Sequence, residues 1–181
     1  MTDDITLTAE EAAELRQGFT YCPRCGSPMV SKHVYDRMRR VCTECRFIQF
    51  IDPKVSAAVM AEKNGKVLLL QRAMDPGRGS WCFPGGFMEI DETPQETAIR
   101  ECKEESGLDI KITKLIDVFH YEDYRGGGVV IMYAGRVVGG TLKAKSEEAK
   151  AIGFFGPDEL PEPIEFDSNV ETLARWVDGK I

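Results

Sequence analysis

Residues 86–108, GFMEIDETPQETAIRECKEESGL, decide how the larger part of this chain folds. Thr93 is followed directly by a proline and, three positions after Thr93, by Glu96, which is the pattern of a capping box with proline at the first helical position. Gly107 then supplies a residue that readily adopts the left-handed conformation at a helix end. The sequence therefore predicts a helix of about three and a half turns between Thr93 and Gly107.

Three carboxylates crowd one edge of this predicted helix. Glu101, Glu104 and Glu105 fall within a sector of about 100°, next to the apolar arc of the helix. Each like-charge pair costs roughly 0.2 to 0.5 kcal/mol, and partial burial raises that cost. A hard divalent cation such as Mg²⁺ turns this unfavourable repulsion into a favourable interaction, because it takes oxygen ligands and is commonly shared with phosphates.

A solvated acidic helix face is the ordinary alternative for such a cluster. The sequence favours a metal site, because the glutamates stand in fixed register with Gly85, Gly86, the capped helix start and Arg100. A residue without a side chain lets its backbone carbonyl approach a cation closely. We therefore expect the Gly86 carbonyl to be a further ligand.

The same stretch resembles the Nudix box, the signature of the Nudix hydrolases. Every fixed position of that signature is matched, and Cys102 in the first aliphatic position is the one mild departure. The resemblance extends over roughly residues 52 to 178. It implies an α/β fold, the Nudix α/β/α sandwich, and metal-dependent hydrolysis of a nucleoside diphosphate linked to another group.

The composition leaves room for one ordinary domain and a small one, since the chain has 181 residues and 43% of them are hydrophobic. Its net charge of -7 argues against nonspecific nucleic-acid binding by the whole protein. The charge is uneven, because residues 20–54 hold seven basic and three acidic residues, a net charge of +4. Four thiolates around Zn²⁺ would halve that local excess.

The sequence gives no sign of a membrane or secretory location. No apolar run approaches the roughly 20 residues of a membrane helix, and the start Met1-Thr2-Asp3-Asp4 lacks the basic and apolar regions of a secretory signal. Metal spacing of four of the six cysteines fits a reducing compartment better than a disulfide scaffold. We expect a cytoplasmic protein with no membrane partner.

Two cysteine pairs have the spacing of a zinc site. Cys22 and Cys25 are separated by sixteen residues from Cys42 and Cys45, as in a four-cysteine tetrahedral zinc site. Two disulfides or a redox dithiol are the alternatives. A ribbon this small needs its metal to fold, so its expected role is structural. The alternative role is an RNA-contacting module that uses nearby arginines, Arg37, Arg39 and Arg40.

The chain divides into three expected parts: an N-terminal helix in residues 1–19, a small zinc-ribbon domain in residues 20–51 and the Nudix hydrolase domain in residues 52–181. In the last part, residues 55–61 and 67–70 predict a central β-hairpin turned at Asn64-Gly65. The other expected elements are strands at 110–121, 129–138 and 152–155, a loop at 122–128, and a final helix capped by Asp167 or Ser168 that packs through Val170, Leu173, Ala174 and Val177.

The hypothesis for catalysis is that Glu101, Glu104, Glu105 and the Gly86 carbonyl hold about one to three Mg²⁺ or Mn²⁺ ions, which bind pyrophosphate and activate water. Arg100 should keep the carboxylates in register. The resemblance implies a further acidic residue on a loop before a late strand, as metal ligand or general base, and Glu148 fits it better than Glu122.

Three residues are candidates for substrate contacts. In similar Nudix hydrolases a basic residue at a strand end can face substrate phosphate, and Arg72 occupies such a position. Tyr121 flanks the expected loop and Tyr124 lies in it. Their rings would stack on adenine or flavin there, unless they are only packing residues.

A zinc ribbon before a Nudix domain is similar to NADH pyrophosphatases and to FAD and ADP-ribose pyrophosphatases. The SQPWPFPxS motif of the NADH enzymes is absent here, and the first proline beyond the box is Pro157, later than in many ADP-ribose enzymes. The stretch Phe166-Asp167-Ser168 looks closest to the FAD and ADP-ribose group. We expect ADP-ribose or FAD to be cut to AMP plus the other phosphate.

Two other functions stay open. One is hydrolysis of NADH or NAD-capped RNA, the single kind of nucleic acid that we consider as a partner. The other is a nucleotide-sensing regulator without turnover, although a full carboxylate set speaks against it. The family resemblance favours a homodimer that acts on a nucleotide small molecule.

Overall fold

The computed structural model describes residues 18–123, 126–143 and 148–181 of the chain. The chain divides into a small compact unit that ends at Pro53, with which the segment Glu122–Gly127 is grouped, and a large unit of Lys54–Tyr121 and Gly128–Ile181. The expected helix in residues 1–19 and the residue Tyr124 lie outside the described residues, apart from Gly18 and Phe19. None of the described helices is long and apolar enough to cross a membrane.

The small unit is built on an antiparallel hairpin of β1 (Met29–Val34) and β2 (Arg37–Cys42). Tyr35 and Asp36 form its turn with φ values of 48° and 58°, as a two-residue turn between twisted strands requires. Its buried core is small, because it consists of Cys22, Met29 and Cys42 with Phe47 packed against them. Such a core supplies little folding free energy by itself.

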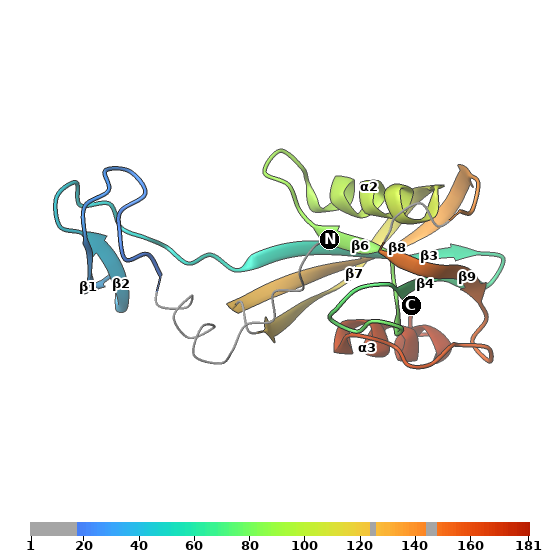
Figure 1. The fold of residues 1–181 in the computed structure, drawn as a ribbon. Helices are drawn as coiled ribbons and strands as arrows, with labels where there is room; N and C mark the ends of the chain where they lie inside the picture. The colour runs from blue at the N-terminus through green and yellow to red at the C-terminus, as the bar shows by residue number, and fades with distance from the viewer. Residues whose placement is uncertain (1–17, 124–125, 144–147) are drawn as a thin grey trace. The chain divides into compact units, whose positions relative to one another are not determined.

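The large unit contains a seven-stranded sheet with pairing order β5-β4-β3-β8-β7, in which β6 also pairs with β3 and β9 with β4 (Figure 1). The hairpin of β3 and β4 turns at Asn64 and Gly65, both with positive φ, and both strands are flanked on each side, as expected. The strands are β3 (Lys54–Lys63), β4 (Lys66–Arg72), β5 (Trp81–Cys82), β6 (Gly85–Phe87), β7 (Leu108–Asp123), β8 (Gly126–Gly140) and β9 (Ala149–Phe155).

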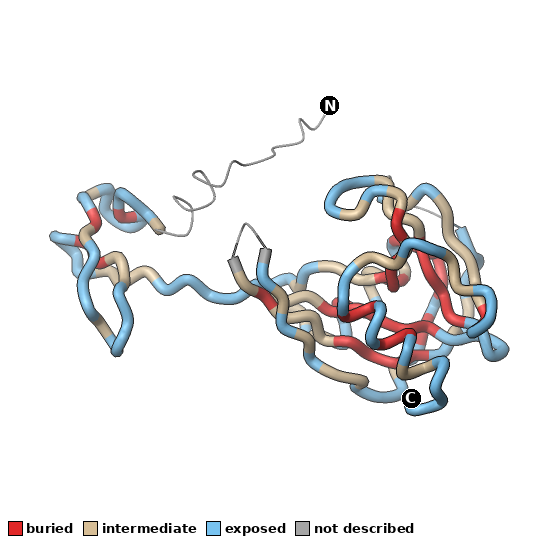
Figure 2. The backbone as a smooth tube through the Cα atoms, turned by 90° about the horizontal axis from the view of Figure 1, so that it is seen from below, coloured by how far each residue is buried: buried red, intermediate tan, exposed pale blue. Residues whose placement is uncertain are grey.

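Helices α2 (Pro94–Ser106) and α3 (Asp167–Val177) cover opposite faces of this sheet, α2 above and α3 below in Figure 1. Val59 and Leu68 face a core that includes Ala98 and Cys102 of α2. The next residues along the two strands, Met60 and Leu69, face a second core with Leu173 of α3. The large unit is therefore the expected α/β/α sandwich, and its buried residues gather in the sheet between the helices (Figure 2).

The boundaries predicted for the helix of the opening stretch are confirmed. The Thr93 hydroxyl accepts a hydrogen bond from the Glu96 amide, and the Glu96 carboxylate accepts one from the Thr93 amide at 2.8 Å. Gly107 ends the helix in the left-handed conformation, with φ 74°. Local capping signals thus fix α2 at both ends.

Two other expectations need correction. The predicted loop 122–128 is shorter, because β7 continues to Asp123 and β8 begins at Gly126. Phe166 holds the N-cap position of α3 without a side-chain cap, so the expected capping by Asp167 or Ser168 is wrong.

The packing face of α3 also differs from the expected one. Val170 and Val177 are 50% and 48% exposed, whereas Asn169 and Thr172 are buried next to Leu173. Asn169 is held at this buried face by a local contact, since its side-chain amide donates to the carbonyl of Glu165, four residues earlier, at 2.8 Å.

Removing the hydroxyl of the capping box should destabilise the large unit. We expect Thr93→Ala to lower the free energy of unfolding by about 1 kcal/mol, because the Glu96 amide loses its acceptor. Thr93→Ser keeps the acceptor and is the control, with an expected change below about 0.5 kcal/mol. Urea titrations of the full chain followed by circular dichroism measure both, and equal losses in the two variants would contradict the assignment.

Candidate active site and metal centre

Strand β6 brings two glycines against the acidic edge of α2. Gly85 and Gly86 pair with Ala58 and Ala57 of β3, and the Gly85 amide donates to a carboxylate oxygen of Glu105 at 3.0 Å. A Cβ atom on Gly86 would lie 2.3 Å from an Oε atom of Glu101. A side chain at position 86 would therefore displace that carboxylate, so the close approach requires glycine.

Arg100 joins the helix to the segment before it. Its guanidinium forms a two-pronged ion pair with Glu92, with 2.9 Å between Nη2 and Oε2, and also donates to the Phe87 carbonyl. Nη1 contacts Glu101 at 2.7 Å and Glu104 at 3.2 Å. A single planar donor fork thus orients three carboxylates. The hydrogen bond from Arg100 is the main reason why the pKa of Glu92 falls to about 2.

The carboxylates next to the glycines carry an electrostatic cost. The pKa of Glu105 is raised to about 8, mainly by burial; the Gly85 amide opposes this rise, and the charges of Glu101 and Glu148 contribute to it. Burial likewise raises the pKa of Glu101, against the hydrogen bond from Arg100. Negative charge is therefore unfavourable at this position unless a cation compensates it.

The structure brings Glu148 and Arg72 to the same edge. The Ala73 amide, next to Arg72 at the end of β4, donates to the Glu148 carbonyl at 2.6 Å, and Arg72 pairs with Ala149 at the start of β9. Both side chains act on Glu105, since the charge of Glu148 raises its pKa and that of Arg72 lowers it. Residues 72 and 148 are far apart in the sequence, and the pairing of β4 with β9 places them together.

The expected ligands are neighbours but do not form a closed metal site. Among the described residues, the four cysteines are the one group of three or more potential ligands whose atoms lie within 4.8 Å of one another. Glu101 and Glu104 share the Nη1 group of Arg100 as hydrogen-bond donor, and Glu105 accepts a hydrogen bond from the Gly85 amide. Their donor set, oxygen atoms of several carboxylates beside a backbone carbonyl, nevertheless suits Mg²⁺ or Mn²⁺.

Tyr121 lies in β7, next to residues 122–128. A Cβ atom on Gly128 would meet its hydroxyl at 2.4 Å, so the ring lies across the neighbouring strand β8. Its proposed stacking on the substrate stays a prediction, as does that of Tyr124. The Phe166 ring, for which the sequence indicates no contact, has its centroid 5.1 Å from Cζ of Arg72. Their contact spans two distant segments, and no local pattern indicates it.

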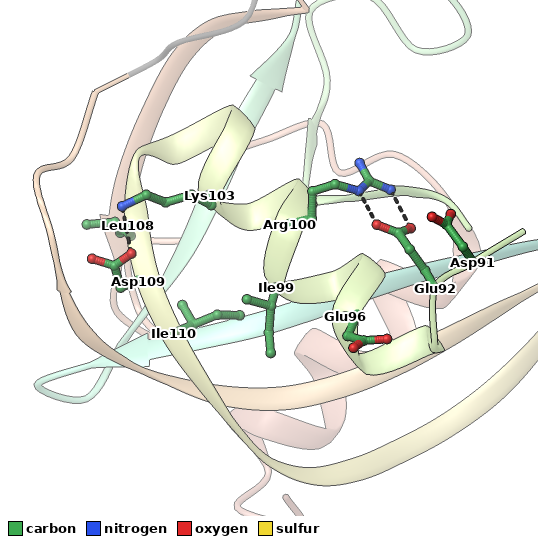
Figure 3. Close-up of a pocket in the computed structure, with 9 residues that line it drawn as sticks. All are labelled: Asp91, Glu92, Glu96, Ile99, Arg100, Lys103, Leu108, Asp109 and Ile110. Carbon is green, nitrogen blue, oxygen red and sulfur yellow. Dashed lines mark hydrogen bonds and ion pairs between the residues drawn. The ribbon is translucent and has the colours of Figure 1, made fainter. Parts of the chain in front are cut away.

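A pocket of about 540 Å³ is lined by residues of α2, of the segment before it and of the start of β7 (Figure 3). Its walls contain the ion pairs Arg100–Glu92 and Lys103–Asp109. Glu101, Glu104 and Glu105 do not line it, so it is distinct from the candidate metal site. The lining residues are Asp91, Glu92, Glu96, Ile99, Arg100, Lys103, Leu108, Asp109 and Ile110.

The four cysteines of the small unit fit a tetrahedral metal site. The Sγ atoms of Cys22 and Cys45 are 3.6 Å apart, and those of Cys25 and Cys42 are 3.5 Å apart. Four sulfurs at about 2.3 Å from a zinc ion are separated by about 3.8 Å, so the spacing and the ligand chemistry agree with Zn²⁺. All six cysteines are free, which removes the disulfide alternative, and His33 is exposed and outside the cluster.

The sandwich and the carboxylates on its capped helix define a Nudix protein, and comparison of the chain with protein families and known proteins agrees. The model of the NUDIX domain matches residues 52–177, so the chain belongs to this family of hydrolases. The ADP-ribose pyrophosphatase of Methanocaldococcus jannaschii is 37% identical over 134 residues, which cover 72% of this chain and 78% of that protein. Its name describes an enzyme that acts on a pyrophosphate bond, and this chain is a Nudix hydrolase, an enzyme that acts on a phosphoric anhydride.

Two other relatives are similar over more of the chain, and a third covers about as much of it as the archaeal enzyme does. The NAD-capped RNA hydrolase NudC of Chromobacterium violaceum is 29% identical over 157 residues, 84% of this chain but 57% of that protein. Among solved structures, a NUDIX hydrolase from Nitrosomonas europaea has a TM-score of 0.81 at 28% identity, with 90% of this chain and 92% of that chain covered. An ADP-ribose pyrophosphatase from Streptococcus suis has a TM-score of 0.58 at 29% identity, with 71% and 92% covered.

The ion pairs of Arg100 should stabilise the large unit more than an ordinary surface pair does. We expect Arg100→Ala to lower the free energy of unfolding by about 2 kcal/mol, because it leaves partly buried carboxylates without their donor. Arg78→Ala removes an exposed pair with Asp75 and is the control, with an expected loss below about 1 kcal/mol. Unfolding of the full chain by denaturant measures the free energy of unfolding of both variants. Losses of the same size in the two would contradict the role given to Arg100.

Proposed function

We propose that this chain is a Mg²⁺- or Mn²⁺-dependent pyrophosphohydrolase that cleaves an adenosine diphosphate derivative, ADP-ribose or FAD, to AMP plus the other phosphate. The main support is the packing of Glu101 and Glu105 against Gly85 and Gly86. There the two carboxylates are partly withdrawn from water beside Glu104 and Glu148, and their charge needs a cation.

In this proposal Glu101, Glu104, Glu105 and the Gly86 carbonyl hold the metal. A bound divalent ion lowers the pKa of a water molecule and neutralises charge on the phosphates. The chain itself orients the carboxylates, since Arg100 holds Glu101 and Glu104 and the Gly85 amide holds Glu105. Glu148 is exposed and near Glu105, which suits a metal ligand or the base that accepts the proton of the attacking water.

Arg72 is proposed to bind a substrate phosphate. It ends β4, its Nε donates to the Pro76 carbonyl at 2.6 Å, and its charge acts on Glu105. A guanidinium held in this way beside the metal ligands offers fixed donors to a phosphate oxygen. Its hydrogen bond to the backbone keeps the cost of ordering this side chain low when substrate binds.

The relatives support two substrate classes. The archaeal relative named ADP-ribose pyrophosphatase has the higher identity, and this favours ADP-ribose. The alignment with NudC is longer than the large unit, so it also includes part of the small unit, and this favours NAD-capped RNA or NADH as the second candidate. The proline-rich motif of the NADH enzymes is absent from the sequence, and we therefore place ADP-ribose and FAD first.

Loss of a single carboxylate on α2 should abolish most of the activity. With Mg²⁺ or Mn²⁺ we expect the parent to release AMP from ADP-ribose or FAD, and Glu104→Gln and Glu105→Gln to lose about a hundredfold or more in kcat. Glu171→Gln changes an exposed glutamate on α3 and is the control. Chromatography of the products from ADP-ribose, FAD, NADH and NAD-capped RNA measures each rate.

The same panel separates the alternatives. Unchanged turnover in Glu104→Gln or Glu105→Gln, with the fold intact, would contradict the metal assignment. Hydrolysis of capped RNA alone would transfer the proposal to the second candidate, with the small unit as an RNA reader. Tight nucleotide binding without hydrolysis would identify a sensor.

We also propose that the four cysteines hold one structural Zn²⁺ ion. Purified protein should contain about one zinc per chain, and Cys25→Ser and Cys45→Ser should lose it because each removes one thiolate ligand. His33→Ala is the control, since His33 is exposed and lies between the cysteine pairs. Mass spectrometry of the metal content measures all three, and full zinc retention in both serine variants would exclude a four-cysteine site.

A further inference from the structure

Phe166, the residue before α3, has a backbone conformation that bulky residues rarely adopt. Its φ is 67° and its ψ is 129°. A side chain at this φ crowds the following carbonyl, so only glycine adopts such values without cost. A strained residue of this kind persists where its surroundings hold it, and such residues cluster at functional sites.

The surroundings of Phe166 hold it from both sides. On the helix side, the buried Asn169 donates its backbone amide to the Phe166 carbonyl and its side-chain amide to the Glu165 carbonyl. On the other side, the Glu165 amide donates to Trp81 and the Trp81 amide donates to Pro163, each at 2.8 Å. The segment before α3 is thus attached to β5, and the strain at Phe166 is fixed by the fold.

This conformation keeps a large aromatic ring at the surface. Phe166 remains 41% exposed, so its ring contributes less to the core than a buried phenylalanine does. One neighbour of the ring is Arg72, whose Cζ lies 5.1 Å from the ring centroid. The Arg72 guanidinium in turn acts on Glu105, and so it is the common neighbour of the ring and of the carboxylate site.

The loop after β4 completes this arrangement. It follows Arg72 and returns to β5, and a Cβ atom on Gly77 would lie 2.4 Å from an Oε atom of Glu165. The loop is therefore in contact with the residue that precedes Phe166. Figure 1 shows the same arrangement, with the segment between β4 and β5 next to α3.

We propose that the Phe166 ring stacks on the purine base of the substrate while Arg72 binds a phosphate of the same nucleotide. The proposal rests on the proposed function and extends it by naming the base-binding residue. An exposed ring beside a guanidinium suits a nucleotide, because the base has an aromatic face to stack and the phosphate has the charge that Arg72 binds. A ring that served only for packing would not need a strained backbone to stay exposed.

The test uses two ligands that differ only by the base, AMP and ribose 5-phosphate, with Mg²⁺ present. For Phe166→Gly we expect AMP binding to weaken about tenfold while ribose 5-phosphate binding is unchanged, since stacking is lost and the phosphate contact stays. Phe166→Tyr keeps the ring and should bind AMP as the parent does. Phe166→Gly should also have an equal or higher Tm, because glycine relieves the strain.

Isothermal titration calorimetry measures the affinities without turnover. Unchanged AMP binding in Phe166→Gly overturns the proposal, and so do equal losses for both ligands, which would mean that Phe166 acts only through Arg72. Phe166→Leu, which keeps apolar bulk without a ring, decides the question if the glycine variant does not fold. Failure of the proposed function would be absent AMP release from ADP-ribose and FAD, and this outcome is independent of the binding result.

Discussion

Strand β6 packs closely against both β3 and helix α2 because residues 85 and 86 have no side chains. A Cβ atom on Gly85 would lie 2.6 Å from the Ala57 carbonyl oxygen in the centre of the sheet, and one on Gly86 would displace Glu101. The approach places a backbone amide on the Glu105 carboxylate. The packing of the sandwich and the position of the acidic cluster therefore depend on the same two glycines.

The local sequence predicted the parts whose determinants are local. The capping box and Gly107 gave the ends of α2, Asn64-Gly65 gave the β3–β4 turn, and the cysteine spacing gave the cluster in the small unit. In each case the residues that fix the geometry are neighbours in the sequence or repeat a known spacing. The carboxylates on α2 were predictable for this reason.

Long-range contacts determine the structural features that could not be predicted from the sequence. The sequence predicted that Asp167 or Ser168 would cap α3. Hydrogen bonds between Trp81 and the segment before the helix fix its start instead, and Phe166 takes the N-cap position. The proximity of Arg72 to Glu105 follows from the order of strands in the sheet. Glu148 was suggested only by the family resemblance, because no pattern around it predicts that β9 pairs with β4.

The charge balance of the site links metal and substrate. Within the described part of the chain, the groups that act on one another here are two guanidinium groups and five carboxylates: Arg72, Arg100, Glu92, Glu101, Glu104, Glu105 and Glu148. Ionised carboxylates therefore outnumber the cations, and a pyrophosphate that arrives alone meets net repulsion. In the proposed function, divalent cations would remove this repulsion and would themselves bind more tightly when phosphate oxygens complete their coordination. Binding of metal and substrate would then be coupled, each raising the affinity for the other by the same factor.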